Sequence, residues 1–486
     1  MFFVGFFLLS HFLFTATLGG EVPIVDGVFG DVPKDVPQVS GIPEPDTSTV
    51  FAPGELRVVE NSGVCETTPN VYQASGYGDI ATNQSIWFWF FESRKNSDTA
   101  PLTLWFNGGP GSSSMVGLFR AHGPCRISND TRSLWFNRYS WNNDSNVLYI
   151  DQPVGVGFSR GDLRVGTSQQ AAVDIWKFLQ IWFTDSRFSK FRNRPLHLWG
   201  ESYGGHYVPS FASHILDQNA AIVANRTVGI PINLKSIGIG NGLTDPLSQY
   251  PGYLTYAANN PYHPLVNNST IQRGTTAWTS ASGCRTQITS CYNGGSNSVC
   301  SAAQSFCNGN VLTPLAGPYN VYFVPMLSND PYPPDFTNYI NSIRARIGAE
   351  GTFQITNRAV YSNFASTGDW MRNSRLDLEK IVNAGIRTLI YAGDADYIVN
   401  YQGIENMLNA MNTNFTSIWK QQSFSTYNVR GQEAGLFKNA GPMSYLRIYG
   451  AGHEVPAYKY KNLDYGEASL QMFLQVAISN VALAST

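Results

Sequence analysis

The segment that most constrains the fold of this 486-residue chain is Gly200-Glu201-Ser202-Tyr203-Gly204. It directly follows an apolar, strand-like run and directly precedes a helix-like segment. In a sharp strand-to-helix turn the backbone runs so close to its neighbours that small residues are needed two positions either side of the serine. Such a turn exposes the serine hydroxyl near a helix N-terminus, so Ser202 is predicted to be a nucleophile.

Short apolar runs rich in β-branched and aromatic residues recur along the chain, as expected of strands. They are 86–91, 102–106, 147–150, 196–199, 237–239, 388–392 and 446–449. Several are followed by glycine-containing loops and then by helical patterns, as at 168–183 and 208–218. This alternation is typical of a mostly parallel sheet with helices on both faces. Together with the serine turn, it predicts an α/β class and the α/β-hydrolase fold.

Changes of composition divide the chain. Residues 1–20 form an apolar run that ends in small residues, which predicts a secretory signal peptide; because it lacks Lys and Arg, a retained membrane anchor is the alternative. Residues 21–50, rich in Pro, Val and Asp, predict a propeptide or an N-terminal arm. Residues 51–248 and 360–486 are expected to form the two parts of the core. The polar stretch 249–359 is expected to be an inserted cap over the ends of the strands.

Six cysteines, an even number, fit a protein of an oxidising compartment. Four of them crowd into the polar stretch, where a nested pairing would staple a subdomain and leave the other two for each other. The expected pairs are Cys284–Cys307, Cys291–Cys300 and Cys65–Cys125. A zinc site is the rival interpretation of the four, but their spacings are long and no histidine lies among them.

The balance of charge indicates which classes of partner to exclude, and the glycosylation signals indicate where the protein is expected to be located. Lys plus Arg (32) nearly cancels Asp plus Glu (34), so the sequence predicts no nucleic-acid partner and no membrane partner. Asn-x-Ser/Thr sequons accept N-glycans in secreted proteins. Seven of them begin at Asn83, Asn129, Asn143, Asn225, Asn267, Asn268 and Asn414. We therefore expect an N-glycosylated protein that is secreted or delivered to an acidic, vacuole-like compartment.

A nucleophilic serine of this kind needs an acid and a base later in the chain, because successive strands deliver them to the same edge of the sheet. Among the seven histidines, His453 follows a strand-like run in a glycine-rich loop near the end, so it is the predicted base. For the acid, Asp394 and Asp396 both follow the run 388–392. Spacing alone does not choose between them.

The segment WFNGGPGSSS, residues 105–114, is expected to stabilise the oxyanion that forms when the serine attacks a carbonyl. Adjacent glycines after a strand allow the backbone to turn its N–H groups toward the nucleophile. The predicted donors are the N–H groups of Gly109 and Tyr203. The predicted site uses no metal ion and no cofactor.

At this point the sequence resembles the serine carboxypeptidases, most closely their secreted fungal members, over residues 65–460. The resemblance rests on WFNGGPGSSS, NRYSWN, DQPVGVGFS, WGESYGGHY, IGNGLTDP, YAGDADYIVN and GAGHEVP. It implies a triad of Ser202, Asp396 and His453. It also implies an exopeptidase that releases single residues from the C-termini of peptides or proteins through an acyl-enzyme.

The resemblance further implies that Asn107, Gly108 and Glu201 bind the terminal carboxylate of the substrate. An ionised Glu201 would repel a carboxylate, whereas a protonated one can donate a hydrogen bond to it, so we expect acidic pH to favour activity. Many members have a glutamate where Ala121 stands, and that glutamate shares a proton with the one beside the nucleophile. Its loss is expected to let Glu201 titrate lower than in those relatives.

Other positions bear on specificity and inhibition. In relatives the position of Glu454 lines the pocket for the departing residue, where a carboxylate would favour Lys or Arg; a solvent-facing Glu454 is the alternative. Ser112 and Val399 stand where many members have cysteines, so mercurials are expected to inhibit little.

The same fold also hosts esterases and acyltransferases, and fold alone does not fix function. A carboxylate-binding Asn107 and Glu201 would serve neither of them, which favours the peptidase. A non-catalytic binding protein of this fold would normally lack members of the triad, and here all three are present.

Overall fold

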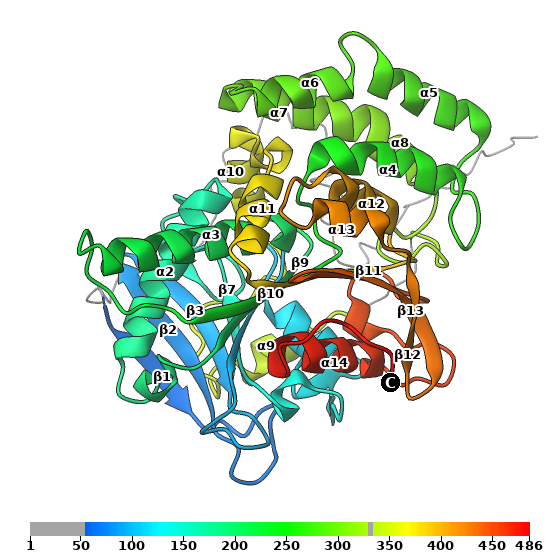
Figure 1. Ribbon diagram of the computed structural model, residues 1–486. Helices are drawn as coiled ribbons and strands as arrows, with labels where there is room; N and C mark the ends of the chain where they lie inside the picture. Colours follow the sequence, from blue (N-terminus) through cyan, green and yellow to red (C-terminus); the bar gives the residue numbers. More distant parts are fainter. Residues whose placement is uncertain (1–53, 329–333) are drawn as a thin grey trace, which may run out of the picture.

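The computed structural model describes residues 54–328 and 334–486, and the predicted signal peptide and N-terminal arm lie outside this part (Figure 1). Its centre is a twelve-stranded sheet with the order β1-β2-β3-β7-β4-β9-β10-β11-β14-β13-β12, in which β8 pairs with β3. The strands are β1 (Leu56–Glu60), β2 (Gln73–Ala81), β3 (Gln84–Phe91), β4 (Leu102–Phe106), β7 (Asn146–Asp151), β8 (Arg160–Gly161), β9 (Leu196–Glu201), β10 (Leu234–Gly240), β11 (Arg387–Gly393), β12 (Ser425–Val429), β13 (Gln432–Ala440) and β14 (Met443–Ile448).

The six central strands, from β7 to β14 in the sheet order, are parallel to one another. Antiparallel strands complete both edges. The predicted α/β class and α/β-hydrolase fold are therefore confirmed, with a sheet that is mixed at its edges. Each predicted apolar run coincides with a strand, except that 446–449 extends one residue past β14.

Strand β3 shows why the sequence of a strand that is buried on both faces is almost continuously apolar. Its side chains alternate between two hydrophobic cores, one on each face of the sheet, so neither face can carry polar residues. Ile86, Phe88 and Phe90 belong to one core, and Trp87, Trp89 and Phe91 belong to the other.

Helices cover both faces of the sheet (Figure 1). One face is covered by α2 (Ser168–Thr184), α3 (Gly204–Val223) and α11 (Arg375–Asn383), whose apolar residues join the first core. Helix α14 (Glu467–Phe473) contributes to the second core on the opposite face. Helices α12 (Tyr401–Ala410) and α13 (Thr416–Gln421) follow β11.

A helical insertion separates the neighbouring parallel strands β10 and β11. Its helices are α4 (Pro246–Ala258), α5 (Asn268–Thr279), α6 (Cys284–Tyr292), α7 (Asn297–Cys307), α8 (Thr313–Leu315), α9 (Thr337–Ile343) and α10 (Arg358–Thr367). The polar stretch that is expected to form a cap falls here, and its limits, residues 249 and 359, lie inside α4 and α10. Disulfides Cys284–Cys307 and Cys291–Cys300 join α6 to α7 in the predicted nested pairing.

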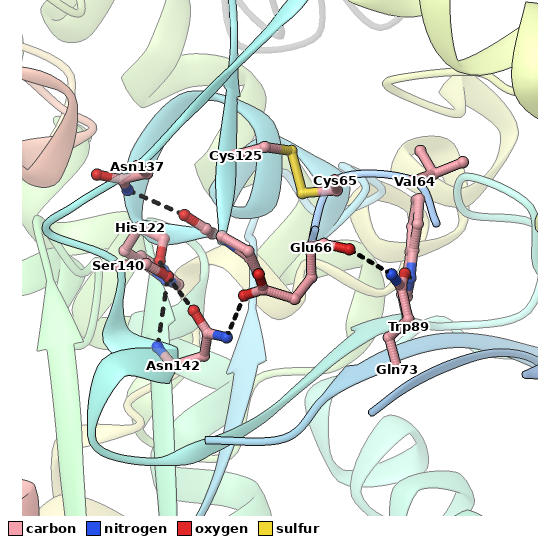
Figure 2. The surroundings of a disulfide bond; sticks show 12 residues. Val64, Cys65, Glu66, Gln73, Trp89, His122, Cys125, Asn137, Ser140 and Asn142 are labelled. Atoms are coloured by element: carbon pink, nitrogen blue, oxygen red, sulfur yellow. Dashed lines mark hydrogen bonds between the residues drawn. A yellow bond between two sulfur atoms is a disulfide. The ribbon is translucent and has the colours of Figure 1, made fainter. Parts of the chain in front are cut away.

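The third disulfide, Cys65–Cys125, joins the loop after β1 to β5 (Cys125–Ile127), which pairs with β6 (Leu134–Phe136) (Figure 2). Beside it the buried Glu66 carboxylate accepts hydrogen bonds from Asn142 Nδ2 and Arg94 Nε, each at 2.8 Å. All six cysteines lie in the described part of the chain and all are paired.

Within residues 54–328 and 334–486, no helix combines the length and the apolar character that a membrane span requires.

Candidate active site

Ser202 lies in the turn between the end of β9 and the start of α3, as the sequence predicts. Its φ is 87°, a backbone conformation that residues other than glycine rarely adopt. Such strain persists only where the surroundings hold it, and it gathers at functional sites. Ser202 is partly exposed, whereas its neighbours Glu201 and Tyr203 are buried. The turn therefore presents the serine hydroxyl to solvent.

The turn requires a glycine on each side of Ser202. The one before the serine is at the predicted position, whereas the one after it is a residue further along the chain than predicted. A Cβ on Gly200 would lie 2.9 Å from the carbonyl oxygen of Phe106, so the position before the serine is as tight as predicted. A Cβ on Gly204 would meet only that same oxygen, at 3.6 Å, which is ordinary contact. The tight position after the serine is Gly205, whose Cβ would lie 2.5 Å from both the nitrogen and the oxygen of Leu243.

His453 and Asp396 meet after the carboxyl ends of β14 and β11. His453 Nδ1 lies 2.9 Å from Asp396 Oδ2, and both side chains are buried. The same Asp396 oxygen accepts hydrogen bonds from Asn241 Nδ2 at 2.9 Å and from Val399 N at 3.2 Å. These contacts hold the Asp396 side chain in the position from which it can orient the imidazole.

The alternative acid, Asp394, faces away from this pair. Its Oδ1 accepts hydrogen bonds from Tyr262 OH at 2.7 Å and from Gly450 N at 2.8 Å. Burial raises the pKa of Asp394 to about 6. Geometry therefore separates two aspartates that spacing could not, and Asp396 is the one placed against the histidine.

Opposing influences act on His453. Burial alone lowers the pKa of the imidazole, but the charge and hydrogen bond of Asp396, together with Glu201 and Glu454, raise it above the usual value. The influence of Glu201 requires its ionised form. A proton retained on Glu201 therefore removes one of the influences that raise the pKa of His453.

The loop after β4 lies directly against the nucleophile turn. A Cβ on Gly108 would overlap the backbone nitrogen of Tyr203 and would lie 2.8 Å from Ser202 Cβ, so only glycine fits there. Gly109 has a φ of 106°, which also favours glycine. The predicted oxyanion donors, Gly109 N–H and Tyr203 N–H, thus belong to two backbone segments that are in contact.

Two buried aspartates, which the sequence analysis did not single out, fix these segments. At the end of β7, Asp151 Oδ1 accepts hydrogen bonds from Ser113 Oγ at 2.6 Å and from Ser114 N at 2.9 Å. Asp369 Oδ2 accepts one from Tyr203 OH at 2.7 Å and another from Ser168 Oγ, also at 2.7 Å. The segment DQPVGVGFS was the available signal for Asp151, because an aspartate directly after a buried strand must find donors.

Asn107 and Glu201, which are predicted to bind the carboxylate of the substrate, are in contact with each other. Asn107 Nδ2 donates to Glu201 Oε1 at 3.2 Å. The other end of the amide, Asn107 Oδ1, accepts hydrogen bonds from Trp105 Nε1 at 2.7 Å and from Gly117 N at 2.9 Å. Because these two donors occupy the oxygen, the amide NH₂ group is directed to Glu201.

Glu201 is 2% exposed, and within the described residues its Oε2 has no hydrogen-bond partner. Burial raises the pKa of this carboxyl well above its usual value, and the charges of Glu454 and Asp396 add to that effect. His453 and Arg120 act in the opposite direction. Burial is the largest of these influences, so it favours the protonated form of Glu201, which can act as a hydrogen-bond donor.

Glu454, the residue expected to line the pocket of the departing residue, is already paired. Its Oε1 lies 3.5 Å from Arg120 Nη1 in η1 (Gly117–His122), and both side chains are largely buried. The sequence analysis did not identify Arg120 as a partner, since nothing in the spacing of 120 and 454 links them. Ala121, which follows Arg120 in the chain, is buried and has no carboxyl group that could share a proton with Glu201.

Comparisons with known proteins agree with this geometry. A family model described as "Serine carboxypeptidase" matches residues 63–476. Carboxypeptidase S1 of Penicillium janthinellum is 40% identical over 433 residues, which cover 88% of this chain and all of that protein. Carboxypeptidase Y of Schizosaccharomyces pombe is 36% identical over 437 residues, which cover 87% of this chain and 42% of that one.

Among solved structures, a prohormone-processing carboxypeptidase from Saccharomyces cerevisiae superimposes with a TM-score of 0.69 at 21% identity. The match covers 84% of this chain and 92% of the yeast chain, and it shows the shared fold. The family model and the 40% identical relative both extend across nearly all of the described core. The chain therefore belongs to the serine carboxypeptidase family.

Proposed function

We propose that this serine carboxypeptidase releases single residues from the C-termini of peptides and proteins through an acyl-enzyme, and that acidic pH favours the reaction. Ser202, Asp396 and His453 are the proposed triad. Their positions at the carboxyl ends of β9, β11 and β14 support it, because this is the edge where α/β sheets bind ligands.

In the proposed reaction Ser202 Oγ attacks the carbonyl carbon of the last peptide bond while His453 accepts its proton. Asp396 holds the imidazole through Nδ1 and stabilises its positive charge. The N–H groups of Gly109 and Tyr203 stabilise the oxyanion. His453 then protonates the departing amine, and water enters by the reverse sequence to release the acyl group from Ser202.

A single observation supports exopeptidase action: Glu201 is buried beside the nucleophile, with one carboxyl oxygen accepting a hydrogen bond from Asn107 and the other without a partner among the described residues. Burial raises the pKa of Glu201, which favours its protonated form. Leaving a buried polar atom unpaired costs free energy, so such an atom is typically kept for a ligand. A substrate carboxylate can accept the Glu201 proton in a hydrogen bond and a second hydrogen bond from Asn107.

Two further assignments complete the proposal. The helical insertion acts as a cap, which is supported by Tyr322: its carbonyl oxygen accepts a hydrogen bond from His453 N at 2.9 Å, and its ring lies 5.2 Å from the imidazole. Export through residues 1–20, with N-glycosylation, is supported by three disulfides, which persist in oxidising compartments. Six of the seven sequon asparagines are exposed, and Asn143 is partly exposed.

The experiment compares two blocked dipeptides that differ only at the C-terminus, one a free acid and the other an amide. We expect the free acid to be hydrolysed with a kcat/KM at least about 100-fold higher, since hydrogen bonds to a charged group contribute about 1.5–3 kcal/mol each. Equal rates for the two substrates would contradict carboxylate recognition and favour an esterase or acyltransferase. A fluorophosphonate that labels the wild type but not Ser202→Ala would exclude a non-catalytic binding protein.

A further inference from the structure

A buried ion pair borders the proposed carboxylate site. Arg120 Nη1 lies 3.5 Å from Glu454 Oε1, and the two side chains are 2% and 12% exposed. Glu454 directly follows His453 in the chain. Burial weakens the screening of charges by water, so this pair can influence a charged group placed beside it.

The guanidinium of Arg120 is held in place by several contacts. Its Nε donates to the carbonyl oxygen of Pro334 at 2.8 Å, and its Cζ lies 5.1 Å from the ring centre of Phe336. Arg120 belongs to η1, whose last residue is His122. The carbonyl oxygen of His122 accepts a hydrogen bond from Ser140 Oγ near the Cys65–Cys125 disulfide, which fixes this end of η1 (Figure 2). Arg120 is therefore a fixed positive charge at this place.

The pair also lies near the position that the departing residue must take. The departing residue carries both the scissile amide nitrogen, which in the proposed reaction receives a proton from His453, and the terminal carboxylate, which is bound at Glu201. The α-carbon of the departing residue thus lies between these two side chains. Glu454 acts electrostatically on both of them, and Arg120 acts on Glu201.

We propose that Arg120 sets the charge preference for the departing residue by compensating the carboxylate of Glu454. This inference rests on the proposed carboxypeptidase function. Alone, Glu454 would attract a departing Lys or Arg and repel Asp or Glu, and alone Arg120 would do the reverse. As a pair they oppose each other, so the preference of the wild type lies between the two extremes.

The test uses Arg120→Met, Glu454→Gln and the double variant. The substrates are three blocked dipeptides that share their first residue and end in Lys, Met or Glu. The readout is the ratio of kcat/KM for the Lys substrate to that for the Glu substrate. Arg120→Met should raise this ratio about tenfold or more, and Glu454→Gln should lower it about tenfold or more, as expected when a charge at close range loses its counter-charge.

The double variant separates specificity from a merely structural role. It leaves neither charge buried alone, so it is the variant best able to fold, and its ratio should stay within about threefold of the wild type because neither charge remains uncompensated. A ratio that changes more than about tenfold in the double variant would overturn the proposal. Equal losses of kcat/KM for all three substrates in the single variants would overturn it as well.

The outcome also distinguishes this inference from the proposed function. If the wild type hydrolyses none of the three free-acid peptides, the proposed function fails and this inference fails with it. If the wild type hydrolyses them but the ratio does not change in any folded variant, only the assignment of Arg120 and Glu454 fails. Arg120→Lys, which keeps the positive charge, is the matched control and should retain the wild-type order of preference.

Discussion

Asn107 and Glu201 lie 94 positions apart in the chain, yet Asn107 Nδ2 is 3.2 Å from Glu201 Oε1. The contact joins the loop after β4 to the end of β9. The side chain of Asn107 is held in its orientation, because Trp105 Nε1 and Gly117 N donate hydrogen bonds to its amide oxygen. The pair is thus oriented before a substrate arrives. Preorganised donors of this kind cost no rearrangement at the moment of binding.

Removal of the Asn107 amide should weaken recognition of the free C-terminus. We expect Asn107→Ala to lower kcat/KM for free-acid peptides about 10- to 100-fold, as one hydrogen bond to a charged group contributes about 1.5–3 kcal/mol. A blocked amino-acid ester, which has no terminal carboxylate, should lose far less. The two substrates are compared in one preparation, and thermal unfolding checks that the variant is folded. An equal loss for both would show that Asn107 does not contact the carboxylate.

The nucleophile turn offers a matched pair of glycines. Gly205→Ala places a Cβ 2.5 Å from the backbone of Leu243 and must shift the turn, so we expect a loss of activity of about 100-fold or more, as misplacement by about 1 Å costs that much. Gly204→Ala meets only Phe106 O at 3.6 Å and should be active and slightly more stable, by about 0.5–1 kcal/mol. Similar activity in both variants would contradict this account of the turn.

The parallel centre of the fold was predictable because buried strands are nearly continuously apolar. The outer strands were not. β1, β12 and β13 are partly exposed and mix polar with apolar residues, and β2 is buried but interrupts its apolar residues with Gln, Ser, Gly and Asp. The helices of the insertion were also missed. Segments such as α5 and α6 are rich in Ser, Thr, Asn and Gln, so they lack a strong apolar periodicity, and the α6–α7 disulfides supply cohesion instead.

For the site, chain order and motifs predicted Ser202 as the nucleophile and His453 as the base. Spacing could not choose between Asp394 and Asp396, because both follow the same strand; the resemblance implied Asp396, and the hydrogen bond to His453 agrees with it. Arg120 could not be predicted as the partner of Glu454, since their contact depends on how η1 packs against the loop after β14. Tertiary packing, rather than any local pattern, determines such pairs.

Asp151 should make stability depend on pH. Burial raises the pKa of Asp151 to about 7, although Ser113, Phe158 and Ser114 donate hydrogen bonds to it. Between about pH 4 and 7 the folded chain therefore holds a proton that the unfolded chain has lost. The resulting contribution to the free energy of unfolding is greatest below about pH 4 and falls by up to about 4 kcal/mol as the pH rises to about 7.

Asp151→Asn does not titrate, so the decline in stability between about pH 4 and 7 should be shallower than in the wild type. Urea unfolding at several pH values measures it. Asp98→Asn is the control. The side chain of Asp98 is exposed, so this variant should keep the wild-type dependence of the free energy of unfolding on pH. An unchanged slope in Asp151→Asn would contradict the protonated state of Asp151.

Mercurials should have little effect on activity. All six cysteines lie in disulfides, and a disulfide offers no thiolate for the metal to bind. Assays with an organomercurial should give the same kcat/KM with and without the reagent. Val399→Cys introduces a thiol next to Asp396, whose Oδ2 accepts a hydrogen bond from the backbone nitrogen of residue 399 at 3.2 Å, and this variant should become sensitive. Strong inhibition of the wild type would contradict the prediction.

The measurement that tests the account most directly is the pH dependence of kcat/KM for a free-acid peptide in the wild type and in Glu201→Gln. Burial raises the pKa of Glu201, and the protonated form is the one that donates to the substrate. In the wild type kcat/KM should therefore fall as rising pH removes this proton. Glutamine keeps a donor and cannot ionise, so the account predicts that the alkaline fall flattens in the variant. An alkaline fall of the same midpoint and depth in both proteins would contradict it.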